Sequence, residues 1–242
     1  MIIERIKRKI ESGLYIVPQS TPIIYFGNYD EAKACTISLN PSNKEFVGSS
    51  DILLDYKDSE RLCSRKQLHK SDNEKLTDNE ARTVLKYCTN YFKLRPYDLW
   101  FKPFDYFIRN YGEYSYYNDT CVHLDLVQWA TYEKWNDLSP FVKQRHLDND
   151  LPVLKYLLNK KFEVMFLNGN TVVNSVAEYL NINLKKKTVS FTNTNGKTKN
   201  LIVSHGSYNQ IEVIGWNVYL QSAAVGGNEN KLILCDLIKR NI

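Results

Sequence analysis

The sequence predicts one α/β domain with three layers (α/β/α), in which a mainly parallel central sheet is covered by helices on both faces. Apolar runs typical of buried strands alternate along the chain with amphipathic segments typical of helices. The 242 residues, 43% of them hydrophobic and 13% aromatic, suffice to bury a large core. We expect a single domain over residues 1–242, although this length also accommodates two small domains.

The first 33 residues predict short elements that precede a core of residues 34–242. Isoleucines at helical spacing, separated by charged residues, indicate a short amphipathic helix at the N-terminus rather than a signal peptide. They are Ile2, Ile3, Ile6 and Ile10. The apolar runs at residues 14–17 and 22–27 predict short strands.

The first part of the core predicts a strand followed by helices. Residues 34–39, with the sequence Ala-Cys-Thr-Ile-Ser-Leu, are typical of a buried strand. A loop-rich stretch follows, with a short helix over residues 59–68. Thr77 and Glu80 form a capping-box pattern that predicts the start of a helix. Aromatic residues at helical spacing predict another helix over residues 95–112.

The middle of the chain continues the alternation of strands and helices. Residues 121–131 predict a second buried strand, and the Ser-Pro pair at residues 139–140 predicts the start of a helix. An amphipathic helix is expected over residues 150–161. Residues 162–180 then predict a strand, a turn and a helix in succession.

The last part predicts a hairpin, a strand and a helix. Asn195-Gly196 stands between two strand-like runs and is a strong signal for a two-residue hairpin turn. Residues 210–216 predict a strand, and residues 228–242 predict the closing helix.

Cysteine and histidine spacing excludes several kinds of site. The five cysteines are odd in number and widely spaced, and the four histidines lie far apart in the sequence. This pattern speaks against a disulfide framework, a zinc site or an iron–sulfur cluster. We therefore expect no metal and no cofactor.

Hydropathy and charge predict a cytoplasmic protein whose charge is compatible with binding nucleic acid. No stretch approaches the roughly 18 apolar residues that a membrane span requires, so we expect no membrane association. The net charge of +5 and a pI near 8.8 fit a partner with a phosphate backbone but do not require one. The lysines cluster at residues 160–161, 185–187 and 197–199.

Polar residues follow the predicted core strands at the points where these strands end. The carboxyl ends of parallel strands are where open α/β sheets bind ligands, so these residues are expected to line a cleft. They are Asn40 with Ser42, Asp125 with Gln128, Asn168, and Trp216 with Asn217.

The order of these motifs resembles the uracil-DNA glycosylase superfamily over residues 34–242. The sequence Ser-Leu-Asn-Pro-Ser at residues 38–42 is similar to the Gly-x-Asn-Pro-Gly-like motif of that family, with serine in place of both glycines. Asp125 stands where the family has a base-reading asparagine. Residues 167–169 are similar to the Leu-Gly turn, with one residue inserted, and residues 216–221 stand where a His-Pro-Ser-Pro-Leu-Ser motif is expected.

The resemblance implies roles for the first two motifs. Asn40 would orient the attacking water, with Pro41 fixing the loop, and Ser42 would line the pocket mouth. An ionised Asp125 only accepts hydrogen bonds, which suits the amino group of a cytosine-like base, whereas a protonated Asp125 would donate to a uracil oxygen. Gln128, Asn168 and Trp216 would contact the substrate. Each of these residues is also consistent with an ordinary turn, cap or core role.

The final motif departs from the family because its histidine is absent. Asn217 or Trp216 stands in its neighbourhood, and His205, one strand earlier, is a candidate substitute. Leu220 corresponds to the leucine that the family inserts into the base stack, with Tyr219 beside it. Phe46 is a candidate for stacking on the extruded base, and the same three apolar residues would equally suit a core.

We therefore expect a monomeric, monofunctional DNA glycosylase that flips out a modified or damaged pyrimidine. A modified cytosine in foreign DNA, such as a phage genome, fits the acidic Asp125 and suggests a role in anti-phage defence. The alternatives are a uracil-DNA glycosylase of base-excision repair and a catalytically inactive DNA-binding protein on the same fold. An unrelated α/β nucleotide enzyme ranks last, because Gly226-Gly227 lacks the companion residues of a phosphate-binding loop.

Overall fold

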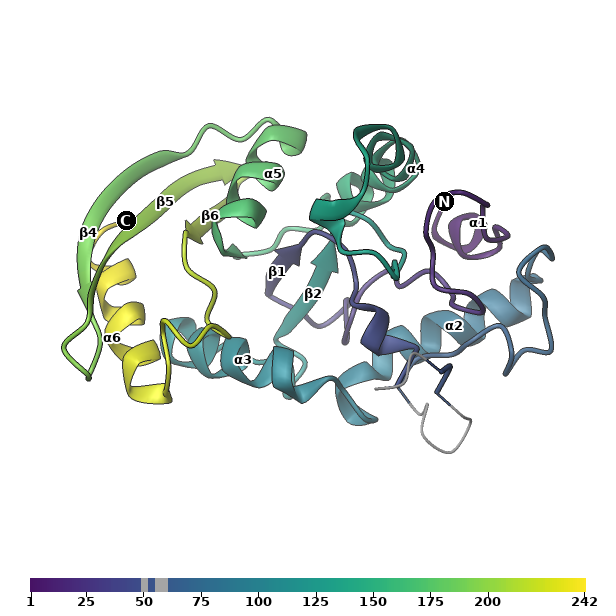
Figure 1. Cartoon of the computed structure of the whole chain (residues 1–242), viewed down its shortest axis with the longest axis horizontal. Helices are drawn as coiled ribbons and strands as arrows, with labels where there is room; N and C mark the ends of the chain where they lie inside the picture. Colours follow the sequence, from purple (N-terminus) through teal and green to yellow (C-terminus); the bar gives the residue numbers. More distant parts are fainter. Residues whose placement is uncertain (49–51, 55–60) are drawn as a thin grey trace. The chain divides into compact units, whose positions relative to one another are not determined.

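The computed structural model describes residues 1–48, 52–54 and 61–242 (Figure 1). The chain divides into two compact units, each assembled from three segments. The first unit contains residues 1–29, 39–97 and 124–157, and the second contains residues 30–38, 98–123 and 158–242. The organisation as one domain, with residues 1–33 preceding a core of residues 34–242, stays a prediction.

The first unit is built mainly from helices. Its elements are α1 (Ile2–Ile6), η1 (Asn43–Glu45), α2 (Asp78–Asn90), η2 (Tyr91–Lys93), η3 (Trp135–Asp137) and α4 (Pro140–Leu157). The capping box that begins α2 is confirmed, because Thr77 Oγ1 accepts from the Glu80 N–H while Glu80 Oε2 accepts from the Thr77 N–H. The expected helix start at Pro140 is also confirmed.

Several expected elements of the first unit differ from the structure. Residues 14–17 and 22–27 do not form strands, and Ile16 makes only an isolated bridge with Thr131. Except for the exposed Tyr15, their apolar side chains are buried as loop residues of the core instead. No helix forms over residues 61–68, and residues 59–60 lie outside the described part of the chain. The two helices expected around residues 140 and 150 are one helix, α4, which continues through Pro152.

A mixed six-stranded sheet with the order β2-β1-β3-β6-β5-β4 confirms the α/β class (Figure 1). Strand β3 pairs in parallel with β1 and β6, whereas β5 pairs antiparallel with β6 and β4. The strands are β1 (Ala34–Ser38), β2 (Cys121–Asp125), β3 (Val164–Asn168), β4 (Lys185–Thr192), β5 (Thr198–Tyr208) and β6 (Ile211–Trp216). The parallel part therefore carries an antiparallel extension.

The hairpin between β4 and β5 is confirmed, but its turn is longer than the expected two residues. Thr192 pairs with Thr198, and the Asn193 N–H donates to the Lys197 carbonyl at 3.0 Å, so residues 194–196 form the turn. Gly196 has a φ of 75°, in the left-handed region that glycine adopts without strain, and its N–H donates to the carbonyl of Asn193. The side-chain oxygen of Asn193 accepts from the N–H groups of Asn195 and Lys197. These local bonds explain why a turn at Gly196 could be predicted from sequence, although its length was not.

Helices of the second unit cover both faces of its strands. These helices are α3 (Asp98–Gly112), α5 (Asn170–Leu180) and α6 (Asn228–Lys239). On β6, neighbouring residues face opposite sides of the sheet. Gly215 lies against Val173 of α5, whereas the Trp216 ring packs against Phe104 and Phe107 of α3, with centroid distances of 5.9 and 4.5 Å. The expected helical layers on two faces are thus present in this unit.

The close packing of α5 on β6 predicts the effect of Gly215→Ala. A Cβ atom at Gly215 would lie 2.7 Å from Cγ2 of Val173, a branched side chain with little freedom to move. We expect the substitution to lower the free energy of unfolding by about 1–3 kcal/mol in urea denaturation. The double variant Gly215→Ala/Val173→Ala should lose less free energy of unfolding than the sum of the losses in the two single variants. Additive losses would contradict this packing.

Candidate functional site

The residues predicted to form the site divide between the two units. Those of the first unit are Asn40, Ser42, Phe46, Asp125 and Gln128. Those of the second unit are Asn168, His205, Trp216, Asn217, Tyr219 and Leu220. The side chains of the two groups differ in their hydrogen-bond partners and burial, which are described below for each unit in turn.

In the first unit, the loop that follows β1 lies beside the segment that follows β2. The Val127 N–H donates to the Leu39 carbonyl at 3.0 Å, and Ser42 forms a bridge with Thr131. Ser42 is exposed, and its hydroxyl accepts from the Lys44 N–H at the start of η1. The predicted Asn40 and Asp125 loops are therefore neighbours in one unit.

The side-chain amide of Asn40 is held in one orientation. The Thr131 hydroxyl donates its single proton to the Glu133 carbonyl at 2.7 Å, so it can only accept from Asn40. Asn40 Nδ2 donates to Thr131 Oγ1 at 3.0 Å and to the Pro41 carbonyl at 3.2 Å. Asn40 is partly exposed, and its Oδ1 has no hydrogen-bond partner among the described residues. The loop thus presents a fixed hydrogen-bond acceptor.

Asp125 and Gln128 place further acceptors in this unit. Asp125 is the last residue of β2 and is 3% exposed. Gln128 Nε2 donates to the carbonyls of Asp125 and Asp150, at 3.4 and 3.3 Å. Its Oε1 is buried and, within the described part of the chain, has no hydrogen-bond partner. A buried acceptor of this kind costs free energy, which a ligand that donates a hydrogen bond would recover.

Glu45 belongs to the same surroundings, although the sequence did not single it out. Its side chain is 3% exposed and accepts a hydrogen bond from the Tyr91 hydroxyl at 2.8 Å. The Tyr91 oxygen in turn accepts from the Tyr97 N–H at 2.8 Å. The pKa of Glu45 is raised to about 7, chiefly by burial and to a smaller extent by the charge of Asp125, whereas Arg61 and the Tyr91 hydrogen bond oppose the shift.

The pattern around Glu45 explains why it was missed. Ser42 and Glu45 have the Ser-x-x-Glu spacing of a capping box, which would make the glutamate an ordinary helix cap. The Ser42 hydroxyl does cap η1, but the Glu45 carboxylate turns to Tyr91, which lies 46 residues away in the sequence. A sequence pattern does not reveal such a long-range contact.

Phe46 lies beside Glu45 and is 2% exposed, so its ring is part of the core. The structure therefore does not present it for stacking on an extruded base. This burial follows from its place between η1 and the buried Val47.

In the second unit, Asn168 ties the end of β3 to the loop that follows β6. Its Oδ1 accepts from Trp216 Nε1 at 3.0 Å and from the Leu220 N–H at 3.1 Å. Its Nδ2 donates to Gln221 Oε1 at 2.9 Å, and Gln221 Nε2 donates to the carbonyl of Trp100. These bonds give Asn168 a positioning role in this loop.

The neighbouring loop residues are also held by the second unit. Asn217 Oδ1 accepts from the Ile202 N–H at 2.9 Å, and its Nδ2 donates to the Asn200 carbonyl at 3.2 Å, so this side chain binds β5. Trp216 and Leu220 are fully buried, at 0% and 1% exposure. Leu220 is therefore a core residue in this structure and does not present itself for insertion between bases.

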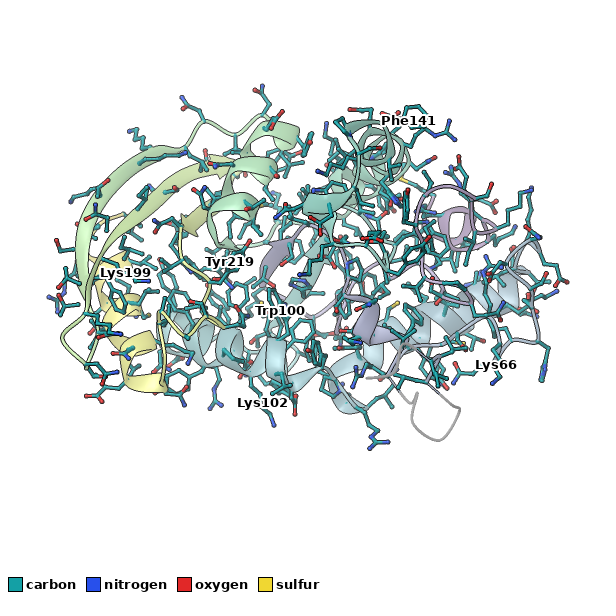
Figure 2. All side chains as sticks on the ribbon, in the orientation of Figure 1. Lys66, Trp100, Lys102, Phe141, Lys199 and Tyr219 are labelled. Atoms are coloured by element: carbon teal, nitrogen blue, oxygen red, sulfur yellow. The ribbon has the colours of Figure 1, made fainter. Side chains whose placement is uncertain are left out.

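Tyr219, which is labelled in Figure 2, is partly exposed, unlike Trp216 and Leu220. Its ring lies against Gly169, where a Cβ atom would come within 2.4 Å of the ring. Gly169 also has a φ of 100°, which favours glycine at this position. The predicted glycine turn thus serves to seat Tyr219.

His205 does not reach the loop after β6. It pairs with Ile214 across β5 and β6, and its Nε2 lies 3.1 Å from Glu212 Oε1. Glu212 is the second residue of β6, whereas Asn217 follows the last one. The His205 backbone thus lies beside the middle of β6, and its ring contacts Glu212, away from the position that the missing motif histidine would occupy.

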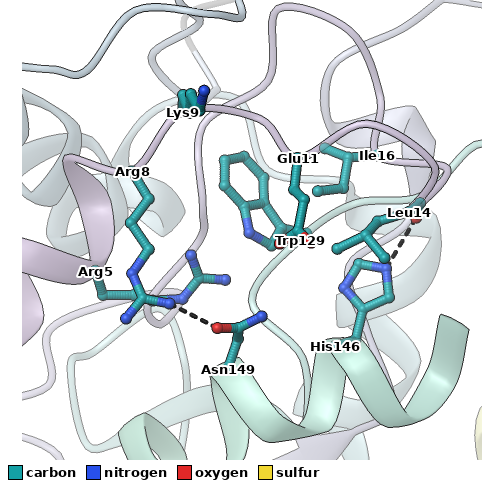
Figure 3. A pocket seen from close by; sticks show the side chains of 9 residues that line it. All are labelled: Arg5, Arg8, Lys9, Glu11, Leu14, Ile16, Trp129, His146 and Asn149. Atoms are coloured by element: carbon teal, nitrogen blue, oxygen red, sulfur yellow. Dashed lines mark hydrogen bonds between the residues drawn. The ribbon is translucent and has the colours of Figure 1, made fainter.

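A small polar pocket in the first unit was also missed by the sequence analysis (Figure 3). His146 Nε2 donates to the Leu14 carbonyl at 2.9 Å, and burial lowers the pKa of His146. His146 Nδ1 and Arg5 Nε have no hydrogen-bond partner among the described residues. The volume of about 30 Å³ suits a water-sized ligand and is too small for a nucleobase.

The described residues contain no group of three or more histidine, cysteine, aspartate or glutamate side chains placed to hold a metal ion. None of the helices in that part of the chain has both the length and the apolar character needed to cross a membrane.

No protein-family model, curated protein or solved structure matches this chain. The resemblance to the uracil-DNA glycosylase superfamily therefore depends on the quoted motifs and their order.

The buried Glu45 predicts a specific dependence of stability on pH. Its folded-state pKa of about 7 lies above the ordinary value of 4.5, so its contribution to stability is present below pH 4.5 and is lost as the pH rises through 7. Between pH 5 and pH 8, the free energy of unfolding of the native protein should fall by about 2 kcal/mol more than that of Glu45→Gln. Urea denaturation at the two pH values measures this difference.

The control for this measurement is Glu229→Gln, which changes an exposed glutamate. Its stability should follow the same pH dependence as the native protein. If Glu45→Gln also follows that dependence, Glu45 is not a buried titrating group.

Proposed function

We propose that this protein is a monofunctional DNA glycosylase that hydrolyses the N-glycosidic bond of a flipped-out, modified pyrimidine. The single observation that carries the proposal is the fixed amide of Asn40, whose Oδ1 is presented as an acceptor at the end of a core strand. A water molecule that donates to this oxygen would be oriented for attack. The proposal includes a three-layer core of the uracil-DNA-glycosylase type.

The reaction joins a water oxygen to the sugar C1′ and breaks the bond between C1′ and the base nitrogen. The electron pair of that bond leaves with the base, which takes up a proton, and the attacking water loses one. Positive charge develops on the sugar in the transition state. Asp125 and the ionised form of Glu45 belong to the same unit as Asn40, and their negative charges would stabilise this cation.

The acceptors near Asn40 favour a base that carries an amino group. Gln128 Oε1, which has no hydrogen-bond partner among the described residues, can accept a hydrogen bond. An ionised carboxylate such as that proposed for Asp125 also only accepts, and the exocyclic amino group of cytosine offers two donors. A cytosine derivative of foreign DNA, such as phage DNA, is therefore the proposed substrate. The protein would act as a monomer in the cytoplasm, without a cofactor or metal ion.

Two features of the second unit favour a different function, a DNA-binding protein without catalysis. The His205 ring nitrogen contacts Glu212 rather than the loop after β6, and Asn217 uses its side chain to bind β5. Neither is then available to stabilise the departing base, which is the role of the absent motif histidine. Tyr219, being partly exposed, is better placed than Leu220 to contact DNA.

The test is to incubate the pure protein with duplex and single-stranded DNA that contains uracil, oxidised pyrimidines, or hydroxymethylated or glucosylated cytosine. Abasic sites would be scored by alkaline cleavage. We expect product on a cytosine derivative and a loss of about 100-fold or more in the rate with Asn40→Ala, since a positioned water is worth several kcal/mol.

Asn43→Ala is the matched control, because it removes the same amide from the same loop. It should keep the native rate. Product on uracil alone would identify a repair enzyme instead. The absence of product on every substrate, or equal rates for native protein and Asn40→Ala, would contradict the assignment of the site and favour the DNA-binding protein.

A further inference from the structure

We propose that the β4–β5 hairpin binds the phosphate backbone of a nucleic acid. The hairpin covers residues 185–208, which contain five lysines and no acidic residue. The lysines are Lys185, Lys186, Lys187, Lys197 and Lys199. Its charge of +5 equals the net charge of the entire chain, so the rest of the protein is neutral on balance. This inference deepens the proposed function and depends on it for the identity of the nucleic acid.

All five lysine side chains are exposed (Figure 2 labels Lys199). Lys186 Nζ donates to Asn174 Oδ1 of α5 at 3.1 Å. Within the described part of the chain, none of the five forms an ion pair with an acidic residue. Their positive charges are therefore available to an external anion.

The register of the sheet places one end of the hairpin at the edge where α/β sheets bind ligands. Trp216, the last residue of β6, pairs with Val203 on one side and with Asn168, the last residue of β3, on the other. Residues 198–202 of β5 therefore extend past the carboxyl ends of both strands, by about 16 Å at 3.3 Å per residue. Lys197 and Lys199 lie in or next to this extension.

The extension is held in place before any partner arrives. The Asn217 side chain binds the Asn200 carbonyl and the Ile202 N–H, and Thr192 and Thr198 hydrogen-bond across the strands at 2.9 Å. The Thr194 N–H donates to Asn230 Oδ1 of α6 at 2.7 Å. A preorganised ribbon loses little conformational entropy on binding, which favours affinity.

Protection of the sheet edge explains only part of this pattern. Strand β4 is the last strand of the sheet, and lysines on an edge strand hinder pairing with another chain. Lysine is a common protecting residue, so this purpose accounts for Lys185, Lys186 and Lys187 of β4. Lys197 and Lys199 lie outside β4. A polyanionic partner explains why these two lysines accompany the three of the edge strand.

The other exposed side chains of the hairpin favour nucleic acid over a lipid surface. Membrane-binding surfaces combine cations with exposed apolar side chains. The exposed neighbours here are hydroxyl and amide residues, which donate hydrogen bonds to phosphate oxygens. They are Thr188, Ser190, Thr192, Thr198 and Asn200. The apolar Phe191 of β4 is buried.

The experiment measures equilibrium binding of an unmodified 20-base-pair duplex at several salt concentrations. The variant carries Lys187→Gln, Lys197→Gln and Lys199→Gln. Each lost phosphate contact should lower the slope of log K against log salt by roughly 0.9, so we expect a decrease of up to about 2.7. The matched control carries Lys66→Gln, Lys75→Gln and Lys155→Gln, three exposed lysines of the first unit.

The control should keep the native slope, although its net charge changes by the same amount. Equal slopes for the two variants would overturn the proposal, because binding would then depend on overall charge. Binding of phosphatidylserine vesicles, but not DNA, that requires the three hairpin lysines would also overturn it.

A parallel assay of abasic-site formation separates this inference from the proposed function. Glycosylase activity with an unchanged slope in the hairpin variant would overturn the hairpin proposal alone. A reduced slope without activity on any modified DNA would support the hairpin and overturn the glycosylase.

Discussion

The single proton of the Thr131 hydroxyl is the constraint on which the proposed site depends. Because this proton goes to the Glu133 carbonyl, Thr131 must accept from Asn40, and the Asn40 amide then has only one orientation. The same contact fixes the loop after β1 against the segment that carries Gln128, an arrangement that the Val127–Leu39 backbone bond reinforces. An amide without this restraint would turn freely and would orient a water poorly.

Amide side chains perform different tasks in the two units. Asn168 and Asn217 use their hydrogen bonds within the protein, where they join β3, β5 and the loop after β6. In the first unit, the oxygens of Asn40 and Gln128 are left as acceptors, and Glu45 is held in a buried position where ionisation is costly. Acceptors without partners and buried carboxyl groups reduce the stability of the fold. Sites that recognise a ligand typically contain such groups. The second unit contributes rigidity and a basic hairpin.

Local patterns allowed much of the fold to be predicted. The capping box at Thr77 and the hairpin around Gly196 depend on residues a few positions apart, and the structure confirms both, with a longer hairpin turn than the expected two residues. The expected strand at residues 14–17 failed because an apolar run does not specify a pairing partner. The position of His205 and the Glu45–Tyr91 bond depend on register and long-range contacts, which no local pattern encodes. The burial of Phe46 and Leu220 has the same origin.

The most direct test of the fixed Asn40 amide is nuclear magnetic resonance of its side-chain NH₂ group, identified by its loss in Asn40→Asp. The account predicts two well-separated proton signals that exchange slowly with solvent in the native protein and in Thr131→Ser, which keeps the hydroxyl. In Thr131→Val, which keeps the shape but cannot accept, exchange should accelerate about fivefold or more, since a net hydrogen bond is worth about 1 kcal/mol. Exchange as fast as that of a free amide in the native protein, or equal rates in all three proteins, would contradict the account.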